Sequence, residues 1–146
     1  MPEPFRLFAP PPAITEKLLL VHSDQLYLAL SMPQIQQVLL NVPVRRVKIG
    51  SKPASVVDFR EMEIPVVLGN RACPPLSQAI IVLLQAPNLK TGLLGVACSE
   101  LPVMSAIAEK DWQTDVPPLP PPWQTDGKGY LYSGQLYIHA TGIAKQ

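Results

Sequence analysis

Residues 53–69 read PASVVDFREMEIPVVLG and contain two short apolar runs, SVVDF at 55–59 and EIPVVLG at 63–69. Both runs are rich in valine and isoleucine, which favour β-strands, and each is shorter than a typical helix. Residues 60–62 separate the two runs. The sequence therefore predicts two consecutive strands here.

Runs of the same kind continue on both sides of this segment. KLLLVHS and QLYLALS, within residues 17–31, predict a hairpin that turns at the Ser-Asp pair 23–24. GYLYSGQLYIHATGI, at residues 129–143, predicts a second hairpin that turns at the Ser-Gly pair 133–134. Both ends of the chain are therefore expected to be β-structure.

The middle of the chain adds more short strands and little helix. The further predicted strands lie at residues 36–40, 42–50, 79–86 and 91–99. A bulge is expected at Arg45-Arg46, and Pro33 fits the first turn of a short helix. Residues 101–112 fit either a helix or a strand. Roughly nine or ten short strands with little helix are typical of a barrel or a sandwich.

A proline-rich run lies between two copies of the tetrapeptide WQTD, at residues 112–115 and 123–126. The repeat is interpreted as chance, or as similar loop chemistry in which Asp and Thr end the strands. An isolated hairpin is marginal in water, so the terminal hairpin must return to the main sheet. Residues 113–127 are therefore predicted to be an internal loop, anchored by a tryptophan at each end.

The N-terminal residues 1–15 are predicted to be a tail. Residues 10–12 are all proline, which favours an extended polyproline conformation. Phe5, Leu7 and Phe8 are apolar enough to dock on the domain or on another molecule.

The composition indicates a single domain without a nucleic-acid partner. The chain has 146 residues, of which 47% are hydrophobic and only 16% are charged. So little charge suggests either a partner that covers part of the surface or a compact proline-rich β protein. The net charge of +1 is not the basic excess of a nucleic-acid binder. Low charge and an apolar N-terminus also favour self-association.

The location is expected to be cytoplasmic, with no insertion into a membrane. Prolines interrupt the N-terminus where a signal peptide would be apolar, and no apolar run reaches the roughly 20 residues of a membrane helix. Cys73 and Cys98 lack metal-binding spacing and are predicted to be reduced.

No catalytic motif or cofactor motif is present, so the chain is predicted not to be an enzyme. Residues 127–129, Gly-Lys-Gly, do not complete a phosphate-binding loop. His22 and His139 each lie in an apolar strand without the further ligands that a metal site needs. Glu61 and Glu63 are interpreted as a solvated strand edge rather than an acid–base pair.

The ordered pattern resembles the CheW-like adaptor domain of bacterial chemosensory systems. Val-Asp-Phe-Arg at 57–60 occupies the place of the family's V/I-N-L-R element, and Ile-Pro-Val-Val at 64–67 matches the strand that follows. The resemblance extends in order over residues 17–143. The proline-rich run before the last hairpin is similar to that of cyanobacterial-type members.

Several polar positions differ from the family pattern. Glu61 and Ser55 stand where the family has glycine, and Asp58 stands where it has asparagine. Ser99 and Gln37 stand where it has acidic residues. The apolar pattern is intact, so these differences bear on partner choice rather than on fold.

The resemblance implies a mainly β, CheW-like fold with two small five-stranded SH3-like barrels that share one core. The domain would span residues 16–146, with a first barrel at about 17–70 and a second at about 78–140. The terminal hairpin, or a terminal helix, is a candidate to complete the first barrel.

The resemblance also implies a non-catalytic adaptor that couples a chemoreceptor tip to the regulatory domain of a CheA-type histidine kinase, without a cofactor. Arg60 is the first candidate for partner binding, because a guanidinium offers a planar fork to carboxylates and carbonyls. The other candidates are Val57, Asp58, Phe59, Gln37 and Val38. In the alternative interpretation, Arg60 ties the loop to its own barrel through Asp58 or Glu61.

Two other functions remain open from the sequence. The first is a proline-rich interaction protein that binds a partner through residues 116–122 or through the N-terminal tail, outside chemosensory signalling. The second is a small β-barrel enzyme or ligand binder, which no residue pattern favours.

Overall fold

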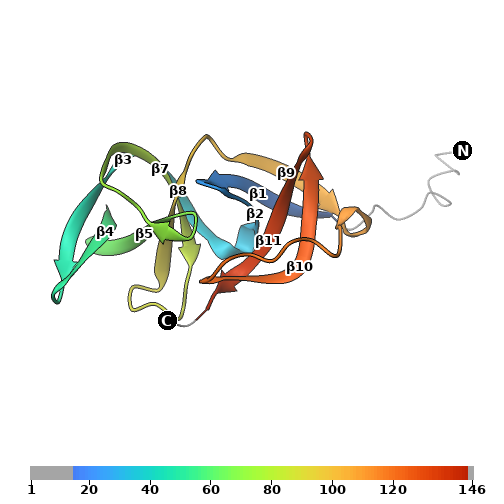
Figure 1. Ribbon diagram of the computed structural model, residues 1–146. Helices are drawn as coiled ribbons and strands as arrows, with labels where there is room; N and C mark the ends of the chain where they lie inside the picture. Colours follow the sequence, from blue (N-terminus) through green and yellow to red (C-terminus); the bar gives the residue numbers. More distant parts are fainter. Residues whose placement is uncertain (1–14, 145–146) are drawn as a thin grey trace, which may run out of the picture.

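The computed structural model describes residues 15–144, which form eleven β-strands and two short 3₁₀ turns (Figure 1). The predicted tail lies outside the described residues except for Thr15, which begins the first strand. The strands are β1 (Thr15–Ser23), β2 (Leu26–Ser31), β3 (Ile35–Ile49), β4 (Lys52–Phe59), β5 (Met62–Leu68), β6 (Arg71–Ala72), β7 (Leu76–Gln85), β8 (Leu93–Cys98), β9 (Val103–Ala108), β10 (Trp123–Tyr132) and β11 (Gln135–Ile143). The 3₁₀ turns are η2 (Met32–Gln34) and η3 (Glu109–Asp111).

Three pairs of predicted strands form antiparallel hairpins. They are β1–β2, β4–β5 and β10–β11. In the last of them, Ser133 and Gly134 form the turn with φ values of 49° and 81°. Pro33 lies in η2, as predicted, and residues 103–108 form a strand rather than a helix.

Five strands close into a ring, which we call the central barrel. The order is β4-β3-β7-β8-β5, and β4 also pairs with β5, while the short β6 extends β5 at the edge. β3 is one long strand rather than two, because it pairs with β7 along its first part and with β4 along its second. The predicted bulge at Arg45-Arg46 is wrong, since both residues pair regularly with β4. The irregularities lie earlier, between Ile35 and Gln37 and around Asn41, whose side chain tolerates its φ of 55°.

The other five strands form a curved sheet, which we call the terminal sheet. Its order is β10-β11-β2-β1-β9, with β2 and β11 parallel. Its two outer strands are linked by the hydroxyl groups of Ser105 and Tyr130, 3.2 Å apart. An isolated bridge also joins Gln113, which follows η3, to Gly129 of β10.

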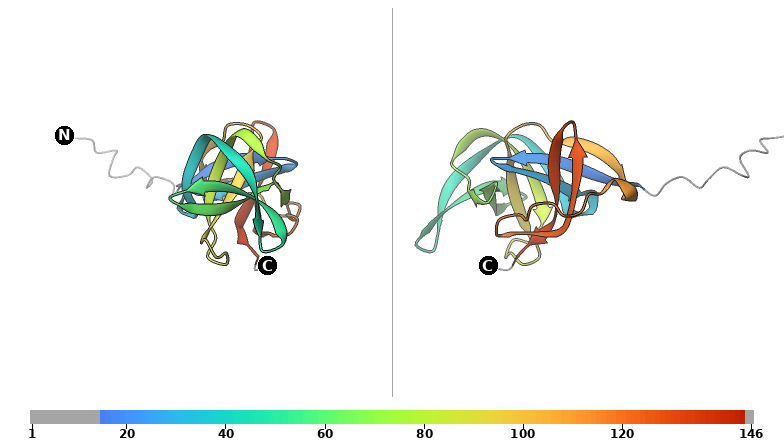
Figure 2. Two further views of the ribbon diagram at one scale, coloured as in Figure 1. Left: turned by 90° about the vertical axis from the view of Figure 1, so that its left-hand side faces the viewer. Right: turned by 45° about the vertical axis from the view of Figure 1, so that its right-hand side comes forward.

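The two sheets do not follow the expected division of the chain near residue 70. The central barrel takes β3 to β8, and the terminal sheet takes β1 and β2 together with β9 to β11. The central barrel lies at one end of the molecule and the terminal sheet at the other (Figures 1 and 2). Pairing of β1 with β9, and of β2 with β11, joins segments far apart in sequence, so local patterns could not predict it.

Alternation along the first strand explains how the two sheets share a core. Leu18 and Leu20 pack inside the terminal sheet, against Ile107. Leu19 and Val21 point the other way and join the shared core, whose other large aliphatic members are Leu28, Leu30, Val82, Leu84, Leu94, Val96 and Ile143. A separate cluster that includes Ile64, Ile81 and Leu83 fills the central barrel. The predicted shared core is therefore confirmed.

The proline-rich segment is an internal loop, but it ends earlier than predicted. Trp123 already begins β10, so the strand includes the whole of the second WQTD tetrapeptide. Leu119 packs on the shared core, and Val116 lies against Gly129 closely enough that a Cβ on Gly129 would be 2.8 Å from it. Trp123 is only 5% exposed, while Trp112 is half-buried against the interior of the terminal sheet.

Candidate partner-binding site

The tip of the β4–β5 hairpin presents Arg60, the first candidate from the sequence. Phe59 pairs with Met62, so Arg60 and Glu61 form a two-residue loop with φ values of 50° and 64°. Positive φ at both central residues is typical of a type I′ turn, which matches the twist of the flanking strands. Arg60 is exposed, and its guanidinium carbon lies 4.8 Å from the centroid of the Phe59 ring.

The alternative role for Arg60, a tie to its own barrel, is not what the structure shows. Within residues 15–144, Arg60 makes no ion pair and no side-chain hydrogen bond. Asp58 instead accepts two hydrogen bonds from Arg45, at 2.9 and 2.7 Å, and Glu63 accepts one at 2.5 Å. The hydrogen bonds from Arg45 lower the pKa of Asp58 below its ordinary value. Arg45 thus links β3, β4 and β5, and the guanidinium of Arg60 remains available to a partner.

The other predicted site residues do not all reach the surface. Val57 is 1% exposed and lies in the core of the central barrel, so it cannot touch a partner directly. Phe59 is half-buried beside Arg60. Gln37 is exposed on β3, whereas Val38 packs against the shared core. Gln37 and Val38 pair with Leu83 and Val82 of β7, whereas Arg60 lies at the tip of the β4–β5 hairpin.

Glu61→Gly is expected to stabilise the protein, because Glu61 adopts a positive φ that glycine tolerates better. A left-handed conformation costs an L-residue about 1–2 kcal/mol, which glycine avoids. Part of this gain is offset because glycine also makes the unfolded chain more flexible. The free energy of unfolding should rise by about 0.5–1 kcal/mol in urea denaturation. Glu61→Ala keeps the strain and should show no gain; an equal gain in both variants would contradict a backbone origin.

A groove of about 390 Å³ lies between the central barrel and the end of the chain. Ala54 and Val66 line it from β4 and β5, and Leu89 lines it from the β7–β8 loop. Pro122 and Ile143 close it on the side of the terminal sheet. A mostly apolar groove between two sheets can accept the apolar face of a helix.

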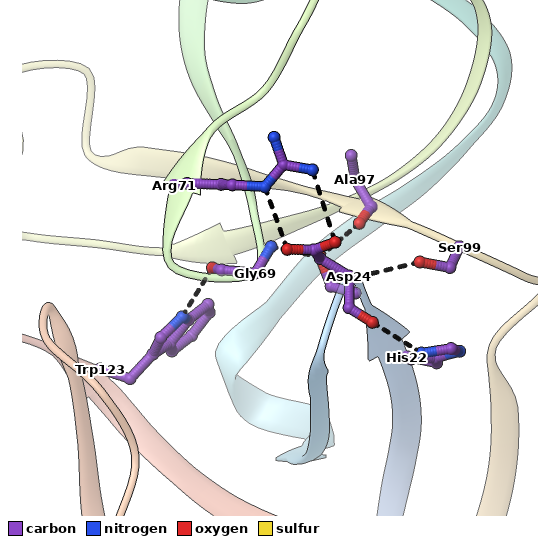
Figure 3. A network of polar contacts seen from close by, with 8 residues as sticks. His22, Asp24, Gly69, Arg71, Ala97, Ser99 and Trp123 are labelled. Carbon is purple, nitrogen blue, oxygen red and sulfur yellow. Dashed lines mark hydrogen bonds and ion pairs between the residues drawn. The ribbon is translucent and has the colours of Figure 1, made fainter.

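Polar contacts fix the orientation of the two sheets beside this groove (Figure 3). The Ser23 hydroxyl donates to the carbonyl of Ala97 at 2.5 Å and accepts from the N–H of Gly69 at 2.7 Å. The Trp123 indole donates to the carbonyl of Gly69 at 2.9 Å. Glycine is needed at position 69, since its φ is +63° and a Cβ would lie 3.1 Å from the carbonyl oxygen of Ser23.

A second set of contacts surrounds Asp24 at the same junction. Arg71 donates to its carboxylate at 3.0 Å, and this hydrogen bond lowers the pKa of Asp24 below its ordinary value. The Asp24 N–H donates to the Ser99 hydroxyl at 2.9 Å, and the His22 ring lies 2.8 Å from the Asp24 carbonyl (Figure 3). Ser99, one of the departures from the family pattern, therefore has a structural role in the junction.

His139 is the residue whose surroundings the sequence did not reveal. Its Nδ1 lies 2.9 Å from Asp126, and its Nε2 lies 3.0 Å from the hydroxyl of Ser31. The ring of Trp112 packs on it with centroids 4.7 Å apart. Trp112 and Asp126 come from different copies of WQTD, so both copies contact His139. The interpretation of the repeat as chance or loop chemistry does not include this contact.

The order Ser31–His139–Asp126 is that of a hydrolase triad, but one more contact opposes that chemistry. Glu16 also lies within hydrogen-bonding distance of the Ser31 hydroxyl. A hydroxyl that donates to Glu16 cannot give the same proton to His139, and a carboxylate beside it would repel a developing oxyanion. A hollow beside Glu16 is lined by Ile107, Glu109, Trp112 and Lys128. Neither Ser31 nor His139 lines it.

The described residues show no arrangement suited to a metal or a membrane span. No group of three or more His, Cys, Asp or Glu side chains in residues 15–144 could hold a metal ion. No helix in this part of the chain has the length and apolar character to cross a membrane. Cys73 and Cys98 are both free, and burial raises the pKa of the Cys98 thiol to about 12.

The closed central barrel, the curved terminal sheet and their shared core define a CheW-like fold. A similar solved structure is the scaffolding protein TtCheW from Thermoanaerobacter tengcongensis, with a TM-score of 0.62 and 14% sequence identity. The match covers 88% of this chain and 90% of that chain. No family model matches the sequence, and no curated protein matches it. The predicted fold class is therefore confirmed.

Proposed function

We propose that the protein is a non-catalytic scaffold of a chemotaxis- or phototaxis-type system, which couples a chemoreceptor to a CheA-type histidine kinase. The observation that carries the proposal is the exposed Arg60, which has no ionic partner within residues 15–144, on a hairpin of a CheW-like fold. An arginine held without an internal ionic partner remains able to bind a carboxylate or carbonyl of another protein.

The hairpin tip is the proposed kinase-binding surface. Arg60 and the half-buried ring of Phe59 would provide the central contact, with Asp58 at the rim. Arginine and aromatic residues are enriched among the residues that contribute most to the binding energy of protein interfaces. Arg45 holds the two strands of the hairpin, so the tip is preorganised before a partner binds. Gln37 on β3 is a second proposed contact.

The groove between the sheets is the proposed receptor-binding surface. Its volume of about 390 Å³ and its apolar lining suit a few anchor side chains from the helical tip of a chemoreceptor. Kinase and receptor would then occupy different surfaces, as a bridging protein requires. The proline-rich loop contributes Pro122 to the groove. We propose a cyanobacterial-type member with a cytoplasmic location.

Titration of the purified protein against the regulatory domain of a CheA-type kinase from the same genome tests the proposal. Micromolar binding is expected, with a receptor-tip helix able to bind the same complex. Competition between kinase and receptor would contradict the two separate surfaces. Failure to bind any such kinase, by a protein shown to be folded, would remove the signalling role while leaving the fold assignment unchanged.

A further inference from the structure

Four side chains from four neighbouring strands form one chain of polar contacts at an end of the terminal sheet. Glu16 on β1 contacts the hydroxyl of Ser31 on β2. That hydroxyl lies 3.0 Å from Nε2 of His139 on β11, whose Nδ1 lies 2.9 Å from Asp126 on β10. His139 is 9% exposed, so its ring nitrogens depend on these partners rather than on water.

Counting protons shows that these contacts need one more than the ordinary forms of the groups supply. Three contacts between heteroatoms require three shared protons if all are hydrogen bonds. With both carboxylates ionised and a neutral imidazole, only two are available, one on Ser31 and one on His139. The third contact is a hydrogen bond only if the network takes up a further proton.

We propose that Glu16, Ser31, His139 and Asp126 form a proton-linked clasp, which holds one extra proton when the terminal sheet is closed. The extra proton makes both nitrogens of His139 donors, one to Asp126 and one to Ser31, while the Ser31 hydroxyl donates to Glu16. When the proton leaves, one of the three contacts is lost. The contact to Glu16 opens first, since Glu16 is exposed and its carboxylate can regain water.

The charges that face the clasp favour the extra proton. Lys128, on β10, and Glu109, in η3, line a hollow of about 180 Å³ together with Glu16 and Trp112. Glu16 and Asp126 are carboxylates of the clasp itself, and Glu109 and Lys128 share the hollow with Glu16. The ring of Trp112, 4.7 Å from that of His139, also favours a cation.

Asp126 is held in its ionised form by the same contacts. Burial would raise the pKa of its carboxyl, but the hydrogen bonds from His139 and from the N–H of Lys128 lower the pKa below its ordinary value. An ionised Asp126 accepts the Nδ1 proton of His139, which leaves Nε2 to carry the additional one. The direction of this shift agrees with the geometry of the clasp.

The sign of the pH dependence follows from linkage. In the unfolded chain a histidine loses its proton near pH 6.5. The folded clasp retains the proton to higher pH, so its stabilisation is fully present below about pH 6.5 and is lost as pH rises. Where only the folded protein holds the proton, the folding equilibrium constant should fall about tenfold per pH unit.

Glu16→Gln tests the clasp, because a glutamine amide supplies the missing proton permanently. Its N–H₂ group donates to Ser31, whose hydroxyl then donates to a neutral His139. Urea denaturation between about pH 6.5 and 8.5 should show the loss of stability in the wild type. In Glu16→Gln, the folding equilibrium constant should change less than about twofold over the same pH range. Glu109→Gln removes the same charge from the same hollow, outside the hydrogen-bonded chain, and should retain the wild-type slope.

NMR of the ring nitrogens gives a second readout that does not depend on unfolding. At pH 7, His139 is expected to carry protons on both nitrogens in the wild type and on Nδ1 alone in Glu16→Gln. Parallel pH dependence in the wild type and Glu16→Gln, or a singly protonated His139 in both, would overturn the proposal. His22, which lies 3.4 Å from Glu100 and outside the clasp, is present in all three proteins, so its contribution cancels from the comparison.

Discussion

Trp123→Ala is expected to lower the free energy of unfolding by about 4 kcal/mol, a large part of the stability of a typical domain. The side chain is 5% exposed within the shared core, so its removal leaves a cavity between the two sheets. It also removes the indole N–H that donates to the carbonyl of Gly69. In a chain of this length, the melting temperature should fall by about 10 °C, as measured by circular dichroism.

Two further variants separate the parts of this effect. Trp123→Phe keeps most of the apolar volume and loses the hydrogen bond, so it should cost about 1–3 kcal/mol. Trp112→Ala removes the equivalent residue of the other WQTD copy, which is only half-buried, and should cost less than Trp123→Ala. Equal losses for Trp112→Ala and Trp123→Ala would contradict the assignment of Trp123 as the anchor between the sheets.

The hairpins could be predicted from the sequence because their evidence is local. Alternating apolar residues around residues 23–24 and 133–134 fix both strands and turn within about fifteen positions. The two runs of residues 53–69 likewise became β4 and β5. Apolar runs with turn residues between them decide such pairs without help from the rest of the chain.

The arrangement of the sheets required information that no local pattern contains. The terminal sheet is completed by pairing β1 with β9 and β2 with β11, across more than eighty and one hundred residues respectively. β3 could not be recognised as one strand, because Asn41 and Pro43 interrupt its apolar pattern while its pairing with β7 continues on both sides of them. β1 and β2 are buried on both faces at their centres, and such burial depends on distant partners rather than on local propensity.

The candidate site was predicted in part. Arg60 was found because the residues around it resemble a known motif, and its exposure agrees with a role in binding. Proximity in sequence suggests Asp58 and Glu61 as its partners. The structure instead pairs Asp58 with Arg45 on the adjacent strand. The motif position of Val57 suggests a partner contact, but its side chain lies in the core of the central barrel.

The clasp around His139 had no sequence signal of its own. Ser31 and His139 are 108 positions apart, and the parallel pairing of β2 with β11 is what brings them together. The repeated WQTD was visible, but a repeat gives no information on which residue its two copies would contact. A polar residue in each of several apolar strands is the only feature that could have suggested a buried network.

Arg60→Glu is expected to weaken binding to the kinase regulatory domain by about 30-fold, equivalent to about 2 kcal/mol. The change removes a guanidinium that has no ionic partner within residues 15–144, and it places a carboxylate where the partner would present an acceptor. Fold stability should change little, because the contact with the Phe59 ring is worth about 0.5–1 kcal/mol at an exposed site. Calorimetric titration and urea denaturation together measure both quantities.

Arg46→Glu is the matched control for this prediction. Arg46 is exposed on β3, in the same barrel, and its reversal changes the net charge by the same amount. If binding depends on the guanidinium at the hairpin tip, Arg46→Glu should bind within about threefold of the wild type. Equal weakening by both variants would mean that overall charge steers the kinase. Unchanged binding by a folded Arg60→Glu would exclude the hairpin tip and direct attention to the surface around Gln37.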